Sequence, residues 1–97
     1  MLPEVQVVFS EDAQDYLIDH GRSLSRRQRL AIAKMIKELE KDPDVGDPPL
    51  FPEYTPCDAW IERHLGSRVH AVFYYDIEKY QDRITIRVRA VRIGMKM

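Results

Sequence analysis

Side chains that can bind phosphate or transfer protons recur at alternate positions in the C-terminal part of the chain. The stretch AWIERHL (59–65) contains Glu62 and His64, and the stretch RVHAVFYYD (68–76) contains Arg68 and His70. Arginine binds phosphate through two parallel hydrogen bonds and stays charged, whereas histidine and glutamate can carry protons near neutral pH. Residue types of this kind suit phosphodiester chemistry.

These two stretches and a third, RITIRVRAVRI (83–93), alternate as strands do. Residues i and i+2 of a strand share one face of the sheet. One face would collect the apolar residues Ala59, Ile61, Leu65, Val69, Ala71, Phe73, Tyr75, Ile84, Ile86, Val88 and Ala90, interrupted by Arg63. The other face would collect Glu62, His64, Arg68, His70, Arg87 and Arg89.

The same polar face also has an ordinary structural explanation. An antiparallel sheet that is covered on one side exposes polar residues on the other. A cross-strand pair such as Glu62 with Arg68 would stabilise the sheet by ~0.2–1 kcal/mol. The alternation alone is compatible with both explanations.

The N-terminal half predicts a strand followed by two helices. The stretch EVQVVF (4–9) is short and rich in β-branched residues, and Ser10 is a good N-cap for a helix over about 11–20. A second helix begins after Ser25, because Gln28 three residues later completes a capping box, and it ends at Asp42-Pro43. Its apolar stripe is expected to comprise Leu30, Ala33, Ile36 and Leu39.

Residues 42–58 contain five of the six prolines and are expected to form a long structured loop. Three strands should follow at 59–65, 68–76 and 83–93, the first two joined tightly at Gly66-Ser67 and the last two by a longer polar tip, IEKYQD. The predicted fold class is therefore α+β. A curved antiparallel sheet would be backed by an N-terminal helical hairpin, in the order β-α-α-β-β-β.

Length and composition predict one domain over residues 1–97. The chain is 44% hydrophobic, which suffices for a single core. It has no apolar run long enough to span a bilayer and no signal-peptide pattern at its start, so we expect a cytoplasmic protein without membrane contact. Cys57 is the single cysteine, so we expect a reduced thiol, no metal site and no cofactor.

The net charge of −1 conceals a strong segregation of charge. Residues 1–21 contain five acids and no base, whereas residues 22–41 contain seven bases and two acids. Residues 42–62 contain six acids and no base, and residues 63–97 contain eight bases and three acids. Basic segments that share a face could attract a polyanion. Ordinary solvated charges on a helix and a strand would produce the same charge pattern in the sequence.

The element order and several short motifs resemble the RelE/ParE family of bacterial and archaeal toxins. The resemblance lies in VVFSEDAQDYL, in the helical pair, and above all in LGSRVHAVFYYD followed by a hairpin and ITIRVRAVRI. It implies a toxin of a type II toxin–antitoxin system, neutralised by a cognate antitoxin. RelE-type members cleave mRNA on the ribosome without a metal, by promoting attack of the 2′-hydroxyl on the adjacent phosphate, and ParE-type members inhibit DNA gyrase.

The resemblance also assigns roles to residues. Arg68 matches an arginine that holds the scissile phosphate, and Arg92, or failing it Arg89, matches an arginine near the end of the last strand. The ending AVRIGMKM lacks the histidine and tyrosine that many nuclease members have there. Proton transfer in an endoribonuclease would therefore fall to Glu62, His64 or His70. Without such a group the chain would act by binding, as a gyrase inhibitor or a catalytically degenerate toxin.

The remaining expectations concern binding surfaces. The candidate substrate-binding residues are Arg63, Arg87 and Arg89. An acidic or amphipathic antitoxin is expected around the apolar stripe of the helical pair and around Leu50, Phe51 and Tyr54 in the proline-rich loop. Trp60 is expected to be a packing anchor or an antitoxin contact rather than a platform for stacking a base.

Overall fold

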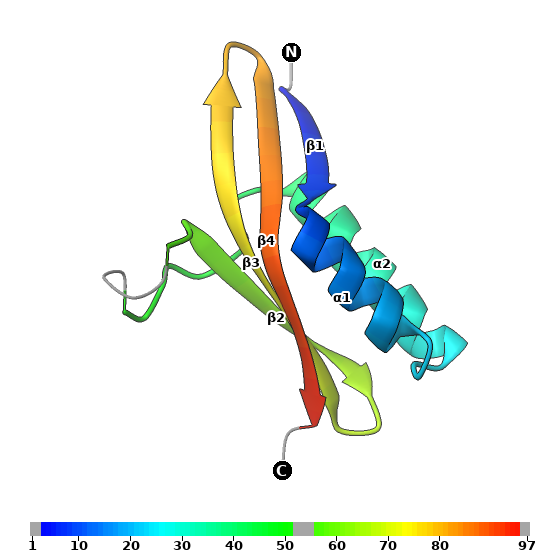
Figure 1. Cartoon of the computed structure of the whole chain (residues 1–97). Helices are drawn as coiled ribbons and strands as arrows, with labels where there is room; N and C mark the ends of the chain where they lie inside the picture. Colours follow the sequence, from blue (N-terminus) through cyan, green and yellow to red (C-terminus); the bar gives the residue numbers. More distant parts are fainter. Residues whose placement is uncertain (1–2, 52–55, 96–97) are drawn as a thin grey trace.

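The computed structural model describes residues 3–51 and 56–95 and contains the predicted order of elements (Figure 1). The elements are β1 (Glu4–Phe9), α1 (Glu11–Gly21), α2 (Arg26–Lys41), β2 (Ala59–Gly66), β3 (Val69–Tyr80) and β4 (Arg83–Met95). The α+β fold class is confirmed. Neither helix is long and apolar enough to cross a membrane. Tyr54, one of the expected antitoxin contacts, lies outside the described residues.

The four strands form one open, mixed sheet in the order β1-β4-β3-β2. The last three strands pair antiparallel, as predicted, and β1 adds to β4 in parallel, from Glu4 opposite Arg83 to Phe9 opposite Val88. A parallel pair needs a long crossover connection, which the two helices and the intervening strands supply. Both helices lie on one side of the sheet (Figure 1).

The hairpin between β3 and β4 is longer than predicted. The sequence IEKYQD was expected to be a polar tip, but β3 continues to Tyr80 and only Gln81 and Asp82 form the turn. Ile77 pairs with Ile86 and packs against the core, so pairing continues beyond the expected end of the strand. The polar residues Glu78 and Lys79 are exposed on this extension.

Both helices begin at their predicted caps. The Ser10 hydroxyl accepts a hydrogen bond from the Ala13 amide at 3.2 Å, and Ser25 and Gln28 form the complete capping box. The predicted stripe of α2 was partly wrong, because Leu30 is 55% exposed and Ala33 is also exposed. The residues of α2 that are buried against the sheet are Ile32, Met35 and Leu39.

Strand β4 contains a β-bulge that changes which residues face the helices. Tyr75 pairs with Val88 and Tyr74 pairs with Ala90, so Arg89 is an extra residue on β4. Alternation therefore reverses after Val88. Val91 is fully buried, whereas Ala90, predicted to be core, lies on the other face.

Beyond Val88 the edge of β4 is covered by α1 instead of β1. The Ser10 hydroxyl donates to the Arg89 carbonyl at 3.1 Å. The Tyr16 hydroxyl accepts from the Ile93 amide at 2.8 Å and donates to the Ile93 carbonyl at 3.3 Å. Side chains of the helix thus replace part of the backbone pairing that ends with β1.

The core lies between the helices and the sheet. Its largest fully buried side chains are Tyr75, Phe73, Met35, Leu39, Ile61, Ile86, Val88 and Val91. The loop before β2 closes over one end of this core, where the Tyr75 hydroxyl lies 3.5 Å from the Pro43 carbonyl oxygen.

Gly46 in that loop has no room for a side chain. A Cβ atom there would lie 2.7 Å from the Trp60 carbonyl oxygen and would collide with the Tyr75 hydroxyl. We therefore expect Gly46→Ala to lower the free energy of unfolding by about 1–3 kcal/mol, measured by urea denaturation. Gly21→Ala is the control, because nothing lies within 4 Å of its Cβ position. Equal stability of the two variants would contradict the packing of this loop on Tyr75.

Candidate functional site

Two histidines meet on the face of the sheet that points away from the helices, here called the open face. His64 on β2 pairs with His70 on β3, and their ring centroids lie 4.8 Å apart with the planes inclined at 73°. Their strand neighbours Leu65 and Ala71 are buried on the opposite face. The structure thus brings together two of the predicted proton-transfer residues.

Glu62 and Arg92 lie next to this histidine pair. Glu62 pairs with Val72 one step along the β2–β3 ladder, and Val72 in turn pairs with Arg92 on β4. A cavity of about 250 Å³ is lined by Glu62, His70 and Arg92 together with their neighbours. The bulge at Arg89 is the reason that Arg92 reaches this face, because uninterrupted alternation would place it among the core residues.

Arg92 is held in place by the backbone and by α1. Its guanidinium donates a hydrogen bond to the Val91 carbonyl at 2.7 Å and lies 5.4 Å from the centroid of the Tyr16 ring. A guanidinium over an aromatic face is attracted by the ring quadrupole. Tyr16 is therefore a positioning residue for Arg92, which sequence reasoning missed because α1 and β4 are far apart in the chain.

Arg68 lies in the β2–β3 turn rather than at the start of a strand. Gly66 pairs with Val69, so Ser67 and Arg68 are the two turn residues, with φ of 52° and 64°. Positive φ at both central positions is typical of a type I′ turn, which prefers glycine or asparagine. An arginine in this region is strained by roughly 1–2 kcal/mol. Arg68 is exposed at the end of the ladder that carries the histidine pair.

The two other predicted arginines of the open face form ion pairs with acids of β3. Arg87 pairs with Glu78 at 3.1 Å, and Arg89 pairs with Asp76 at 2.8 Å. The hydrogen bond from Arg87 to Glu78 raises the pKa of the Arg87 guanidinium. These pairs reduce the positive charge that the middle of the open face can offer to an anion.

Arg63, a predicted substrate-binding residue, lies on the opposite face of the sheet. Its guanidinium donates to the Glu38 carboxylate of α2 at 2.8 and 3.0 Å and to the Glu62 carbonyl at 2.7 Å. Arg63 interrupts the apolar face of β2 because it forms an ion pair with Glu38 of α2. The structure does not bring Arg63 together with His64 and His70.

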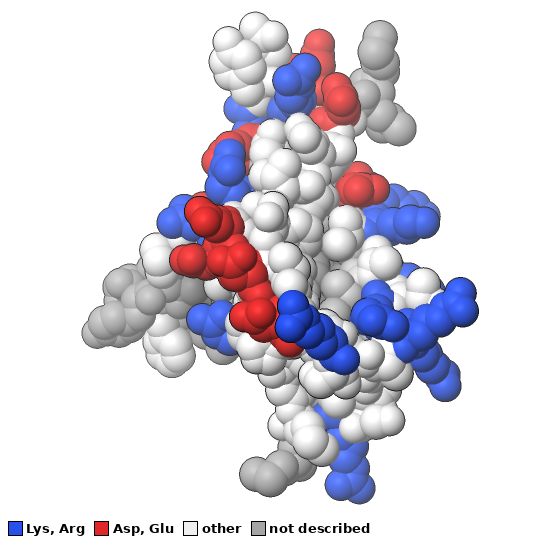
Figure 2. Space-filling model, turned by 45° about the vertical axis from the view of Figure 1, so that its right-hand side comes forward, with Lys and Arg blue, Asp and Glu red and all other residues white. Residues whose placement is uncertain are grey.

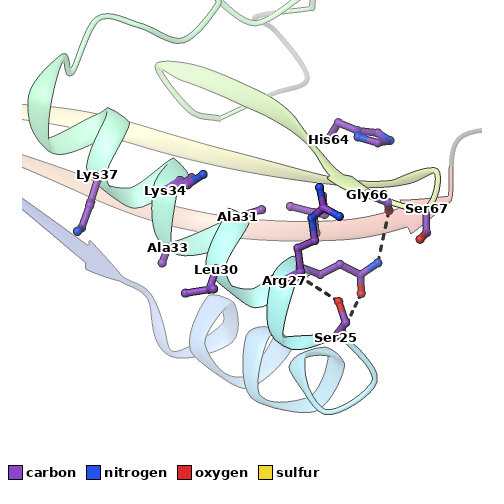
Figure 3. A pocket seen from close by; sticks show the side chains of 12 residues that line it. Ser25, Arg27, Leu30, Ala31, Ala33, Lys34, Lys37, His64, Gly66 and Ser67 are labelled. Carbon is purple, nitrogen blue, oxygen red and sulfur yellow. Dashed lines mark hydrogen bonds between the residues drawn. The ribbon is translucent and has the colours of Figure 1, made fainter.

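A second concave region, here called the α2 groove, lies between α2 and the end of β2 (Figure 3). It has a volume of about 710 Å³, and its cationic residues are Arg27, Lys34 and Lys37. In the described part of the chain these three make no ion pair. Figure 2 shows acidic side chains gathered in a band and basic ones clustered beside it on the helical side of the molecule. The segregation of charge along the sequence thus persists on the folded surface.

Neither metal binding nor thiol chemistry is favoured by the residues that the structure describes. Within residues 3–51 and 56–95, no three His, Cys, Asp or Glu side chains gather as a metal site would require. Burial, and then the charge of Asp76, raises the pKa of the Cys57 thiol. A thiol that stays protonated is a poor nucleophile.

Comparison of the chain with protein-family models, with curated proteins and with solved structures found no match.

The position of Arg63 predicts a structural role that can be measured. Both partners are partly exposed, so we expect Arg63→Gln and Glu38→Gln to be coupled by about 0.2–1 kcal/mol in a double-mutant cycle of unfolding free energies. Arg83→Gln, at the exposed far end of the sheet, is the matched control and should show no coupling with Glu38→Gln. Absence of coupling between Arg63→Gln and Glu38→Gln would contradict a structural ion pair between these two residues.

Proposed function

We propose that the chain is the toxin of a type II toxin–antitoxin pair and that it acts as a RelE-like endoribonuclease that inhibits translation. The observation that carries the proposal is the edge-to-face contact of His64 with His70, whose ring centroids lie 4.8 Å apart, with Glu62 and Arg92 beside them on the open face. The element order agrees with the one that the sequence resemblance implies. Together they support metal-independent cleavage of RNA.

In this mechanism the two histidines divide the proton transfers. One imidazole removes the proton from the 2′-hydroxyl, whose oxygen attacks the adjacent phosphorus. The bond from phosphorus to the 5′-oxygen breaks, and that oxygen takes a proton from the other imidazole, which leaves a 2′,3′-cyclic phosphate and a 5′-hydroxyl. Glu62 lies close enough in the ladder to serve as an alternative base. Arg68 and Arg92 would stabilise the negative charge that develops on the phosphate oxygens.

A toxin that acts by binding, such as a DNA gyrase inhibitor of the ParE kind, is the second candidate. It is favoured by the ion pairs of Arg87 and Arg89, which leave the middle of the open face with little net positive charge for RNA. In this case the exposed arginine of the β2–β3 turn would contact a protein target and no phosphodiester bond would be cleaved.

The proposed antitoxin would cover the α2 groove. The groove combines the cations Arg27, Lys34 and Lys37 with apolar residues that include the 55% exposed Leu30. A segment with acidic and apolar residues complements such a surface. The predicted loop contacts Leu50 and Phe51 are exposed, but they line a pocket with Trp60 and Tyr74 of the sheet and do not line the α2 groove.

The turn at Arg68 allows activity and stability to be separated. Glycine suits a positive φ, so we expect Arg68→Gly to raise the free energy of unfolding by about 1 kcal/mol. The same variant should lose about a hundredfold to a thousandfold in RNA cleavage, the loss typical when a group that stabilises transition-state charge is removed. Arg83→Gly is the matched control, an exposed arginine at the distant hairpin. Cleavage of mRNA in a translation reaction and a urea curve are measured side by side.

Induced expression with pulse labelling distinguishes the two candidates. Rapid loss of protein synthesis with wild type and not with Arg68→Gly supports the endoribonuclease, and His64→Gln and His70→Gln should then also be inactive. Loss of DNA synthesis with filamentation supports gyrase inhibition. Undiminished toxicity of Arg68→Gly and of both histidine variants would refute the catalytic assignment.

The partner proposal predicts a charge-dependent complex. Co-expression with the neighbouring small open reading frame should yield a stable complex in which Lys34 and Lys37 are shielded. We expect the double variant Lys34→Glu, Lys37→Glu to weaken that complex markedly, because it places like charges opposite the acidic segment. Lys79→Glu, on the distant β3 extension, is the control. A complex that tolerates the double variant equally well would place the antitoxin elsewhere.

A further inference from the structure

An aromatic pocket lies on the open face beside the histidine cluster. Its walls include Phe51 of the loop, Trp60 of β2 and Tyr74 of β3, and its volume is about 270 Å³. It shares Glu62 and Val72 with the cavity that holds His70 and Arg92. The two cavities are therefore neighbouring parts of one surface.

Strand pairing and hydrogen bonds position the Trp60 ring of this pocket beside Tyr74. Trp60 and Tyr74 are directly opposite each other in the β2–β3 ladder, so their side chains are neighbours on the open face. The Trp60 indole donates a hydrogen bond to the Pro48 carbonyl at 2.9 Å. The Trp60 amide and carbonyl also bond to Asp47 at 2.9 and 2.8 Å. The indole is thus held in place before any ligand arrives.

The loop that carries Phe51 completes the pocket from outside the sheet. It approaches β2 on the side of the molecule opposite to the helices (Figure 1). Phe51 is 62% exposed and Leu50 is 78% exposed, although both line the pocket. Apolar side chains that surround a cavity and remain accessible are ready to bury a ligand.

The chemistry of the walls favours a planar ring over a phosphate. Aromatic faces stack on any nucleobase, whereas the described residues that line the pocket include no lysine or arginine to bind a phosphate. The volume lies just below the roughly 300–1,000 Å³ of pockets for drug-sized ligands, which suits one ring system.

We propose that this pocket binds a nucleobase of single-stranded RNA, next to the nucleotide whose phosphate reaches His64 and His70. Consecutive pairs on one face of a strand are about 6.6–6.8 Å apart. Trp60, Glu62 and His64 therefore form a continuous track from the base to the cleavage cluster. The inference rests on the proposed function for the identity of the polymer, and it gives Trp60 the stacking role that sequence reasoning had ranked below packing.

The single tryptophan of the chain makes the proposal measurable without cleavage. Trp60 fluorescence is titrated with a short RNA carrying 2′-O-methyl groups, which cannot undergo the transfer reaction, and with the same backbone lacking bases. We expect quenching by the RNA and none by the abasic strand. Tyr74→Leu, which keeps apolar volume but removes the ring, should weaken binding roughly 5- to 150-fold. Tyr80→Leu, at the far end of the sheet, should leave binding unchanged.

The outcomes separate this inference from the proposed function. Base-dependent quenching without cleavage of mRNA in a translation reaction would support the pocket and refute the endoribonuclease. Cleavage with equal quenching by both strands, or with unaltered binding by a folded Tyr74→Leu variant, would refute the pocket and leave the endoribonuclease intact. Quenching by the co-expressed partner protein and not by RNA would assign the pocket to a protein side chain and overturn the inference.

Discussion

The fold depends on a sheet that is covered by helices on one face only, and the bulge at Arg89 adapts β4 to that constraint. Without the extra residue, Ala90 and Arg92 would face the helices while Val91 faced solvent, and a guanidinium would be placed next to the core. Burial of an unpaired charge is far more costly than a local break in a ladder. With the bulge, Val91 is fully buried and Arg92 lies near His70. The packing requirement of the core thus determines the composition of the open face.

Ion pairs then decide which cations of this small domain remain accessible to an anion. Arg63 is tied to Glu38 on the helical face, and Arg87 and Arg89 are tied to Glu78 and Asp76 on the open face. Among the described residues, Arg68 and Arg92 near the histidine pair and Arg83 at the opposite end of the sheet make no ion pair. A further group of such cations lies in the α2 groove. The histidine pair and the α2 groove meet at His64, which belongs to the pair and also lines the groove. They differ in their other neighbours, because aromatic rings lie near the first and exposed residues of α2 line the second.

In the β2–β3 turn the backbone conformation favours glycine, whereas the proposed function requires the arginine at position 68. Two non-glycine residues with positive φ occupy a turn that glycine would form with less strain. Strained backbone persists only where the surrounding structure imposes it, and it is frequent at functional sites. The turn is stabilised by the Gly66–Val69 pair, which follows a register shift after the His64–His70 pair, and by the hydrogen bond from Gln28 to the Gly66 carbonyl at 3.4 Å. Arg68 is therefore presented at the edge of the cluster on a short, well-supported connection.

The sequence by itself determined the elements, their order and the α+β class, because caps, periodicity and turn residues act over a few neighbouring positions. The Ser25–Gln28 capping box, and the position of His64 and His70 on the same polar face, were predicted from such local patterns. Only the tertiary structure decided that β1 joins β4 in parallel, that Arg89 is a bulge and that Arg63 pairs with Glu38. Each of these features depends on contacts between residues far apart in the chain, such as Tyr16 with Ile93, which local patterns do not encode.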